Sequence, residues 1–217
     1  MQSKSRQDVQ DLYQAGAKNY DFTTVLFRLI GLRMNTYRSI AIERLSLKRG
    51  DVVVELGCGT GLNFPLLLEK IGKEGRLIGV DLTPNMLDIA RKRVAQNGWQ
   101  NVELIQSDIA AYEYPQQLNA VLVTGVLGYI PEYDQVIKAL AEALVPDGHL
   151  SILDGKQPEN LPLWLFNIVL KLGKQYGYTP EYFSVRPWES VEHYFTEMSF
   201  ETHYGGMIYI VSGTAGQ

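Results

Sequence analysis

The chain has 217 residues, a length typical of one domain with a single core. Hydrophobic residues make up 46% and charged residues 20%, an ordinary globular composition that excludes disordered, collagen-like and coiled-coil classes. The formal net charge is −4, although residues 1–50 hold nine Lys or Arg against four Asp or Glu. A chain that is acidic overall does not indicate binding to a nucleic-acid duplex.

The number of cysteines and the length of the apolar segments indicate the cellular compartment of the protein. Cys58 is the single cysteine, so the chain can form neither an internal disulfide nor a Cys-rich zinc site, and we expect no metal. The first ten residues are polar, unlike a secretory signal, and the most apolar segment, 161–172, is shorter than the roughly 20 residues of a membrane span. We therefore expect a soluble, cytoplasmic protein.

The N-terminal part of the chain has a helical pattern. Residues 7–18 are weakly helical, and apolar residues recur at helical spacing from Phe22 to Leu47. The spacing predicts two helices before any strand. These helices would form an N-terminal cap over residues 1–47.

Strands and helices alternate after Gly50. The predicted strands are apolar on both faces in most cases and span residues 52–56, 76–81, 102–106, 120–124 and 149–154. The predicted helices span residues 62–71, 84–97 and 132–144, with Thr83-Pro84 as a helix start and Asn97-Gly98 as a stop. This alternation predicts right-handed crossovers and a parallel sheet with helices on both faces.

The last third of the chain departs from this rhythm. An apolar, aromatic-rich insertion spans residues 161–182, and a helix is predicted over 187–198. Two short strands follow at 200–204 and 207–211, and Gly205-Gly206 between them is a hairpin signal. We therefore expect a seven-stranded, mostly parallel sheet that ends in an antiparallel hairpin.

The strongest local motif is a buried strand, 52–56, that runs into a glycine-rich turn and then a helix. Glycine permits positive φ and lets a ligand approach the backbone closely. The glycines fall at 57, 59 and 61, and position 62 is Leu62, where a dinucleotide fingerprint has its third glycine. No Gly-Lys-Ser/Thr follows, so a Walker phosphate loop is also excluded.

Acidic residues follow the next two strands. Asp81 ends the second strand, twenty residues past Gly61, where a carboxylate can accept hydrogen bonds from both ribose hydroxyls. Asp108 follows the third strand and can accept a hydrogen bond from an adenine amino group, between apolar walls formed by Leu82 and Ile109. Three consecutive strand ends would then hold one adenosine.

Residues 48–154 resemble the core of class I S-adenosylmethionine-dependent methyltransferases. The resemblance rests on the E/D-x-G-x-G-x-G sequence at residues 55–61, on Asp81 and on Asp108. It implies a Rossmann-like, doubly wound α/β fold and transfer of a methyl group from S-adenosylmethionine. The whole chain, 1–217, would be a single domain with the cap at 1–47, the cofactor-binding core at 48–154 and substrate-side segments at 155–217.

The resemblance also implies cofactor-binding residues. Gly57 and Gly59 would contact the methionine moiety of the cofactor. Glu55 and the Thr124 backbone carbonyl would both lie on the side of its amino group, which is an ammonium when protonated. The full set consists of Tyr20, Glu55, Gly57, Gly59, Gly61, Asp81, Leu82, Asp108, Ile109 and Thr124.

The acceptor is less well defined by the sequence. Tyr20-Asp21 and the basic helix ending at residues 41–47 are similar to small-molecule and lipid methyltransferases, including those of quinones and phospholipid headgroups. A small-molecule or lipid-like acceptor is implied, while the oligomeric state stays open. The predicted helix over 22–47 carries Arg28, Arg33, Arg38 and Arg44. With the apolar segment 161–172 it would cap an apolar substrate or touch an anionic bilayer, or it would pack on the sheet with its arginines in water.

A hydroxyl or ring-carbon acceptor benefits from a general base, whereas a neutral amine needs little more than orientation. The candidate bases are His193, on a predicted helix, and Tyr129, on a loop expected beside the methyl donor. Cys58 is interpreted as a small structural residue of the glycine turn. Three alternatives stay open: aminocarboxypropyl transfer from the same cofactor, a binding module without chemistry, and a nicotinamide-dependent oxidoreductase.

Overall fold

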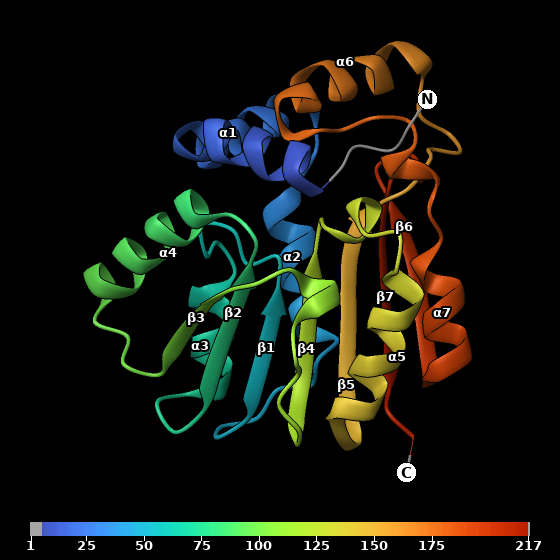
Figure 1. Ribbon diagram of the computed structural model, residues 1–217. Coiled ribbons are helices and arrows are strands. Elements are labelled where there is room, and N and C mark those ends of the chain that lie inside the picture. Colours follow the sequence, from blue (N-terminus) through green and yellow to red (C-terminus); the bar gives the residue numbers. More distant parts are fainter. Residues whose placement is uncertain (1–5, 217) are drawn as a thin grey trace.

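The computed structural model describes residues 6–216 and contains one seven-stranded sheet in the order β3-β2-β1-β4-β5-β7-β6 (Figure 1). The strands are β1 (Val52–Leu56), β2 (Arg76–Asp81), β3 (Val102–Gln106), β4 (Leu118–Thr124), β5 (Leu144–Gly155), β6 (Thr196–His203) and β7 (Ile208–Thr214). The first five strands are parallel, and β7 runs antiparallel to both of its neighbours. The predicted mostly parallel sheet with a terminal hairpin is confirmed.

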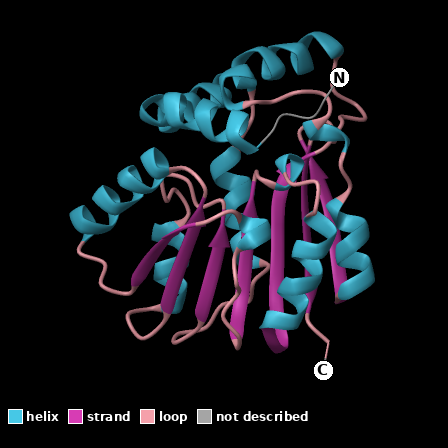
Figure 2. Ribbon diagram, in the orientation of Figure 1, coloured by secondary structure: helices cyan, strands magenta, loops and turns pink. Residues whose placement is uncertain are grey.

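Helices cover both faces of the sheet (Figure 2). One face carries α2 (Met34–Glu43), α3 (Phe64–Ile71) and α4 (Pro84–Asn97), and the other carries α5 (Tyr133–Ala143) and α7 (Pro187–Tyr194). Because successive strand residues point to opposite faces, Val53 packs with Ile42 on one side and its neighbour Val54 packs with Ile137 on the other. Both faces of the central strands are therefore buried, which explains their continuous apolar sequences.

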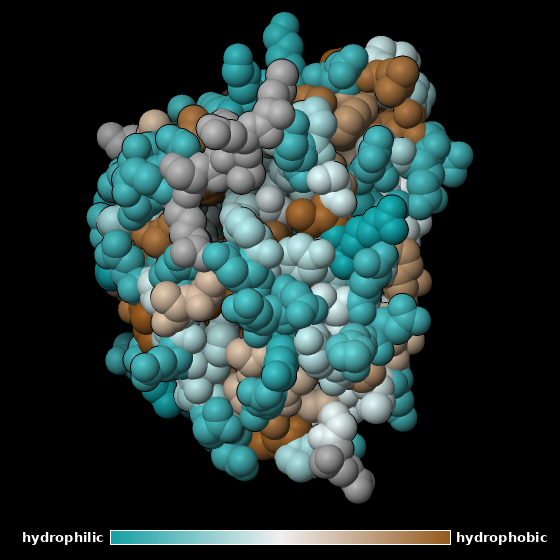
Figure 3. All heavy atoms as spheres, turned by 45° about the vertical axis from the view of Figure 1, so that its right-hand side comes forward, coloured by the Kyte–Doolittle hydropathy of each residue, from teal (hydrophilic) through white to brown (hydrophobic). Residues whose placement is uncertain are grey.

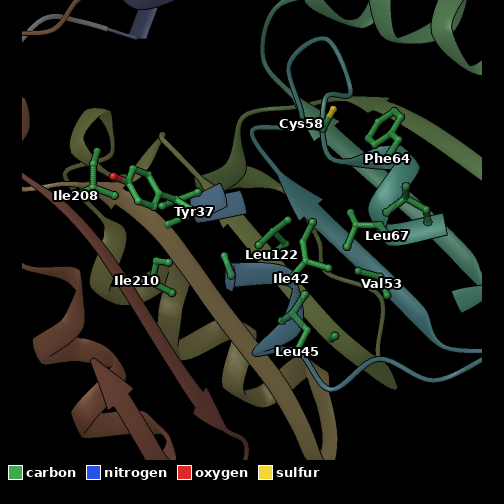
Figure 4. Close-up of a cluster of buried hydrophobic side chains, with 14 of the residues drawn as sticks. Tyr37, Ile42, Leu45, Val53, Cys58, Phe64, Leu67, Leu122, Ile208 and Ile210 are labelled. Carbon is green, nitrogen blue, oxygen red and sulfur yellow. The ribbon is translucent and has the colours of Figure 1, made fainter. Parts of the chain in front are cut away.

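The core beneath α2 and α3 anchors the strand that leads into the glycine turn (Figure 4). Val53 and Leu122 from the sheet meet Ile42 of α2, Leu67 of α3 and Leu45 of the turn after α2, and each of these side chains is at most 2% exposed. Burying a side chain of this size contributes roughly 1.5–3 kcal/mol to folding. The glycine turn thus starts from a rigid base.

The N-terminal helices break at a position different from the one that the sequence predicted. A single helix, α1 (Arg6–Phe27), covers the first predicted segment and the start of the second, and it continues into the short helix η1 (Arg28–Ile30). The predicted helix over 22–47 is wrong, because Gly31 adopts a left-handed φ of 84° and ends η1 there. This turn buries Leu32 beneath the helices before α2 begins.

The C-terminal elements also differ in their bounds. The predicted helix over 187–198 ends at Tyr194, and β6 begins at Thr196, where it pairs with Thr214 of β7. Tertiary pairing with β7 therefore overrides helical pattern over the last residues of that segment. The hairpin at Gly205 and Gly206 is confirmed, with φ values of 65° and 81°.

Two helices lie over the carboxyl ends of the parallel strands: α1, and α6 (Leu163–Gly173) from the aromatic-rich insertion (Figure 1). The short helices η3 (Leu127–Tyr129), η4 (Lys174–Tyr176) and η5 (Tyr182–Ser184) fill the space beneath and beside them. The Tyr204 hydroxyl donates to the Ile30 carbonyl and ties the β6–β7 hairpin to this cap. The cap formed by α1, α6 and these short helices therefore covers the edge of the sheet at which ligands bind in open α/β folds.

Candidate functional site

The glycine turn after β1 is held against the end of β2. Gly57 and Gly59 have φ values of 70° and 53°, and the Gly57 and Cys58 N–H groups both donate to the Val80 carbonyl. A Cβ atom on Gly57 would lie 2.1 Å from the Val126 side chain. A larger residue at position 57 is therefore excluded both by its backbone conformation and by the lack of space.

Asp81 fixes this turn with its carboxylate. Oδ2 accepts from the Gly59 N–H at 2.8 Å, and Oδ1 accepts from the Thr83 N–H at 2.8 Å. Desolvation by the surrounding protein raises the pKa of Asp81, while the two N–H donors oppose that rise. Each carboxylate oxygen accepts more than one hydrogen bond, so both can still receive ribose hydroxyls.

A first cavity opens between the ends of β1, β2 and β4 and offers about 750 Å³ of space free of protein atoms, part of it open to solvent. We call it the nucleoside cavity. It brings together nine of the residues singled out in the sequence: Tyr20, Gly57, Gly59, Asp81, Leu82, Asp108, Ile109, Thr124 and Tyr129. Most of its surface is apolar, with Asp81 and Asp108 as its acidic groups, as a nucleoside site requires.

A second cavity, which we call the inner cavity, lies on the other side of the glycine turn and extends beneath α1 and α6. It offers about 930 Å³ of space between protein atoms, part of it open to solvent, and shares with the nucleoside cavity the residues Tyr20, Gly57, Gly59, Thr124 and Gly125. Its inner wall is formed by apolar side chains of the cap and of β7, including Phe27, Leu32, Val169 and Ile208. A ligand bound across the turn would therefore reach both cavities.

Glu55 lies at the floor of the inner cavity and is 1% exposed. Its Oε1 accepts from the Asn63 side-chain amide at 2.7 Å, and the same amide donates to the Thr124 hydroxyl at 3.1 Å. Burial raises the pKa of Glu55 to about 8. Its second oxygen, Oε2, is buried without a hydrogen-bond partner among the described residues, so it can accept a hydrogen bond from a ligand.

Arg38 of α2 lies at the same cavity and is 8% exposed. Its Nε is buried without a partner in the part of the chain that the structure describes, and its Nη1 reaches Asn35 only at 3.4 Å. Its positive charge lowers the pKa of Glu55 against the larger effect of burial. The alternative in which Arg38 lies in water is therefore wrong.

The two buried atoms without a partner, Glu55 Oε2 and Arg38 Nε, show whether the cavity fits a ligand such as S-adenosylmethionine. A buried acceptor on Glu55 and a buried donor on Arg38 line one cavity next to the glycine turn. An α-amino acid carries an ammonium and a carboxylate, which would satisfy Glu55 and Arg38 respectively. The residues fit the methionine end of the cofactor, and the nucleoside cavity fits the other end.

Aromatic side chains surround the junction of the two cavities. Six tyrosines form a continuous cluster with ring centroids 4.5–6.1 Å apart: Tyr13, Tyr20, Tyr129, Tyr176, Tyr178 and Tyr182. The Tyr13 and Tyr129 hydroxyls lie 3.3 Å apart, and burial raises the pKa of both. At neutral pH these rings are uncharged and present apolar faces to a ligand.

α1 is fastened over the nucleoside cavity by polar contacts. The Gln10 amide donates to the Leu82 carbonyl at 3.1 Å, and the Thr60 hydroxyl donates to Asp21 at 2.7 Å. Arg93 of α4 forms an ion pair with the other oxygen of Asp21 at 2.6 Å. The helix is thus joined to the glycine turn, to the end of β2 and to α4.

The sequence analysis missed two further residues of the inner cavity, Asp154 and Tyr182. Asp154 lies near the end of β5, is 4% exposed, and accepts a hydrogen bond from the Tyr182 hydroxyl of η5. The signal that could have found Asp154 is the one that found Asp81, because carboxyl ends of parallel strands meet at one edge of a sheet. Tyr182 had no such signal, because it comes from an insertion.

Of the remaining sequence candidates, His193 and Gly61 line neither cavity, whereas Cys58 lines the inner cavity. His193 is exposed on α7, where it contacts the Tyr194 ring, and it does not line either cavity. Gly61 has a φ of 76° and faces Phe64 beneath the turn. Cys58 is buried in the turn, and burial raises the pKa of its thiol, which therefore stays protonated.

Comparison with known proteins shows which proteins this core is similar to. Residues 53–148 match the model of a methyltransferase domain. The chain is 36% identical over 155 residues to a demethylmenaquinone methyltransferase of Lactobacillus johnsonii. That alignment covers 70% of this chain and 63% of the relative, so the chain spans less than two thirds of that relative's length.

Solved structures share the fold. A methyltransferase from Aquifex aeolicus, described as dependent on S-adenosylmethionine, superposes with a TM-score of 0.62 at 20% identity, covering 82% of this chain and 89% of that one. Phosphoethanolamine N-methyltransferase 2 of Haemonchus contortus, in complex with S-adenosyl-L-methionine, superposes with a TM-score of 0.67 at 16% identity, covering 84% and 53%. At these identities the likeness establishes the architecture.

Proposed function

We propose that this chain, whose core is a class I S-adenosylmethionine-dependent methyltransferase domain, moves the methyl group of S-adenosylmethionine to an aromatic, lipid-like acceptor. The observation that carries the proposal is the junction of the two cavities at Gly57 and Gly59. Adenosine would occupy the nucleoside cavity, with Asp81 on its ribose. The amino acid end would meet Glu55 and Arg38.

The bound donor supplies a methyl group already activated on a sulfonium, so the protein's task is to orient the acceptor and exclude water. The tyrosine cluster and the closed cap meet both needs. Flat aromatic faces around the inner cavity favour a ring-shaped acceptor, and its apolar far wall favours a hydrocarbon tail. The name of the Lactobacillus relative agrees with a quinone-type acceptor for this chain.

The test is incubation of the protein with S-adenosylmethionine and two acceptors, a short-tailed 1,4-naphthoquinol kept reduced and phosphoethanolamine. We expect S-adenosylhomocysteine and a naphthoquinol product heavier by one CH₂ group, detected by mass spectrometry. Methylation of phosphoethanolamine alone would contradict the aromatic acceptor. Release of methylthioadenosine would indicate aminocarboxypropyl transfer instead, and tight binding without turnover would indicate a binding module.

A lipid-like acceptor also requires a route from a membrane, and we propose that the cap touches an anionic bilayer. Five large apolar side chains protrude from α1, η1 and α6: Phe22, Val25, Leu29, Leu163 and Trp164, each at least 63% exposed. We call them the cap patch. Their helices pack inward against the residues that line the inner cavity.

The surroundings of the cap patch favour a lipid surface as its partner. Arg28 and Arg33 are exposed beside it, and each cation near an anionic bilayer contributes roughly 1 kcal/mol. Figure 3 shows hydrophobic atoms at the upper edge of the molecule, where the cap lies. Among residues 6–216, no helix is both long and apolar enough to cross a membrane, so contact would be peripheral.

Vesicle flotation tests this contact. We expect the protein to float with vesicles containing phosphatidylglycerol, and the double variant Leu29→Ser, Trp164→Ser to lose about tenfold in bound fraction, because two exposed apolar anchors are removed. Phe200→Ser, on the far hairpin, is the matched control and should float like the wild type. Equal flotation of the double variant would contradict the proposal. A concentration-dependent dimer lost in that variant would assign the patch to a second copy.

A further inference from the structure

Asp154 and Tyr182 form a buried pair at the inner cavity that the binding of the methyl donor does not use. Asp154 Oδ2 accepts from the Leu127 N–H at 2.9 Å, and Oδ1 accepts from the Gly155 N–H at 2.7 Å. The Tyr182 hydroxyl donates to the same Oδ1. The carboxylate is thus fixed by N–H groups of η3 and β5 and by the tyrosine hydroxyl, and both side chains belong to residues that line the inner cavity.

The fold keeps Tyr182 in one orientation. A Cβ on Gly128 would lie 2.3 Å from its ring, and a Cβ on Gly155 would lie 3.3 Å from it, so two glycines make room for the ring. Tyr129 and Tyr178 pack against it with centroids 4.5 Å and 5.1 Å away. A hydroxyl fixed in this way is pre-organised toward a ligand in the inner cavity.

We propose that Tyr182 and Asp154 form a proton relay for an acceptor that carries a ring hydroxyl. In this relay Tyr182 accepts the hydroxyl proton of the acceptor and passes its own proton to Asp154. Tyr182 is the catalytic residue, because it touches the acceptor, and Asp154 is a positioning residue that acts through it. The inference rests on the proposed function and narrows its substrate class to hydroxylated aromatic rings.

The relay balances in protons and electrons. The O–H bond of the acceptor breaks, and its electron pair stays on the acceptor, where conjugation makes a neighbouring ring carbon a better nucleophile. A new O–H bond forms on Tyr182 as its former proton forms an O–H bond on Asp154 Oδ1. When that carbon takes the methyl group, the methyl–sulfur bond breaks and its electron pair stays on sulfur. The hydrogen of the methylated carbon then moves as a proton to the ring oxygen and restores the hydroxyl. Asp154 gives its proton to water, so nothing is oxidised and one proton reaches solvent.

The electrostatics of the pair suit this role. Burial raises the pKa of Asp154 to about 6, so the carboxylate is ionised at pH 7 and is a stronger base than a solvated aspartate. Burial raises the pKa of Tyr182 well above its ordinary value, so tyrosinate does not form and the transfer must be concerted. The titratable groups that face Asp154 from neighbouring elements are the hydroxyls of Tyr182, Tyr178, Tyr129 and Tyr209.

Tyr182→Phe tests the relay while keeping the ring and its packing. With the reduced short-tailed 1,4-naphthoquinol as acceptor, we expect kcat to fall about 100-fold and KM to change less than about threefold, within the range of lost acid–base catalysis. The wild-type kcat should fall as pH drops through about 6, because Asp154 must be ionised. This pH dependence should disappear in the variant.

A proton inventory in mixtures of H₂O and D₂O gives a second readout that a merely structural role would not move. We expect a curved dependence for the wild type, because two protons move together, and a linear one for Tyr182→Phe. Tyr194→Phe, on the outer face of α7, is the matched control and should behave like the wild type. Asp154→Asn should show the same kinetics as Tyr182→Phe if it folds.

The outcomes separate this inference from the proposed function. If the wild type methylates no hydroxylated ring, the proposed aromatic acceptor fails. If it methylates the naphthoquinol but Tyr182→Phe keeps its kcat, its pH profile and its curved inventory, the relay is overturned while the proposed function stands. A loss confined to KM would also overturn the relay, because it would assign Tyr182 to binding alone.

Discussion

Replacing Asp81 by asparagine is expected to weaken S-adenosylhomocysteine binding by about 100-fold, which corresponds to about 2.7 kcal/mol. The Asp81 oxygens accept from two backbone N–H groups that shape the glycine turn. An asparagine would turn an NH₂ donor toward one of these donors and would leave one fewer acceptor for ribose. The lost acceptor weakens ligand binding directly. The NH₂ group that faces a backbone N–H also destabilises the glycine turn, which weakens binding further.

Isothermal titration calorimetry with S-adenosylhomocysteine measures this loss, and thermal unfolding shows whether the variant is folded. Asp88→Asn is the matched control, because Asp88 is exposed on α4 and forms an ion pair with its helix neighbour Arg91. We expect its affinity to stay within about twofold of the wild type. An Asp81→Asn protein that binds as tightly as the wild type would remove the nucleoside site from this edge of the sheet.

Much of the central fold follows from local pattern. β1, β2, β3 and α4 begin and end where hydrophobic periodicity and turn residues predicted. Gly98 ends α4 in a left-handed conformation, as a glycine beyond a helix usually does. These elements are specified locally because each apolar residue faces a core on its own side of the sheet.

The acidic strand ends were predictable for a related reason. Asp81 and Asp108 follow neighbouring parallel strands, and such ends meet at one edge of the sheet whatever the details of packing. The cofactor assignments of these residues remain predictions, since a binding experiment decides them. The geometry places both at one cavity.

Contacts between distant segments could not be predicted in this way. Tyr182 meets Asp154 only because the insertion folds back over β5, and Arg38 reaches the cavity of Glu55 only because the chain turns at Gly31 before α2. Helical periodicity places an arginine on a face of a helix but does not say whether that face meets water or a cavity. Tyr182 with Asp154, and Arg38 with Glu55, therefore come together only in the folded tertiary structure.

Arg38 and Glu55 carry the last prediction, which concerns affinity and pH together. Arg38→Met is expected to weaken S-adenosylhomocysteine binding by about 100-fold, because the ligand carboxylate loses a charge-assisted partner. Methylthioadenosine lacks the amino acid end, so its affinity should not change in this variant. Arg33→Met, at an exposed position just before α2, is the matched protein control.

The pH dependence follows from Glu55. Burial raises its pKa to about 8, so the free protein holds a neutral carboxyl at pH 7. An ammonium group beside it favours the ionised form, so binding should release a proton, and affinity should rise by up to about tenfold per pH unit between pH 6.5 and 8. Glu55→Gln should bind without this pH dependence.

Calorimetry in two buffers of different ionisation enthalpy counts the released proton. Because Arg38 lowers the pKa of Glu55, the rise in affinity should move to higher pH in Arg38→Met. A structural role for either residue would change affinity without moving the proton count. If S-adenosylhomocysteine bound with no proton release in the wild type, the amino acid end of the ligand would have to lie away from Glu55. The two buried orphan atoms would then need another partner.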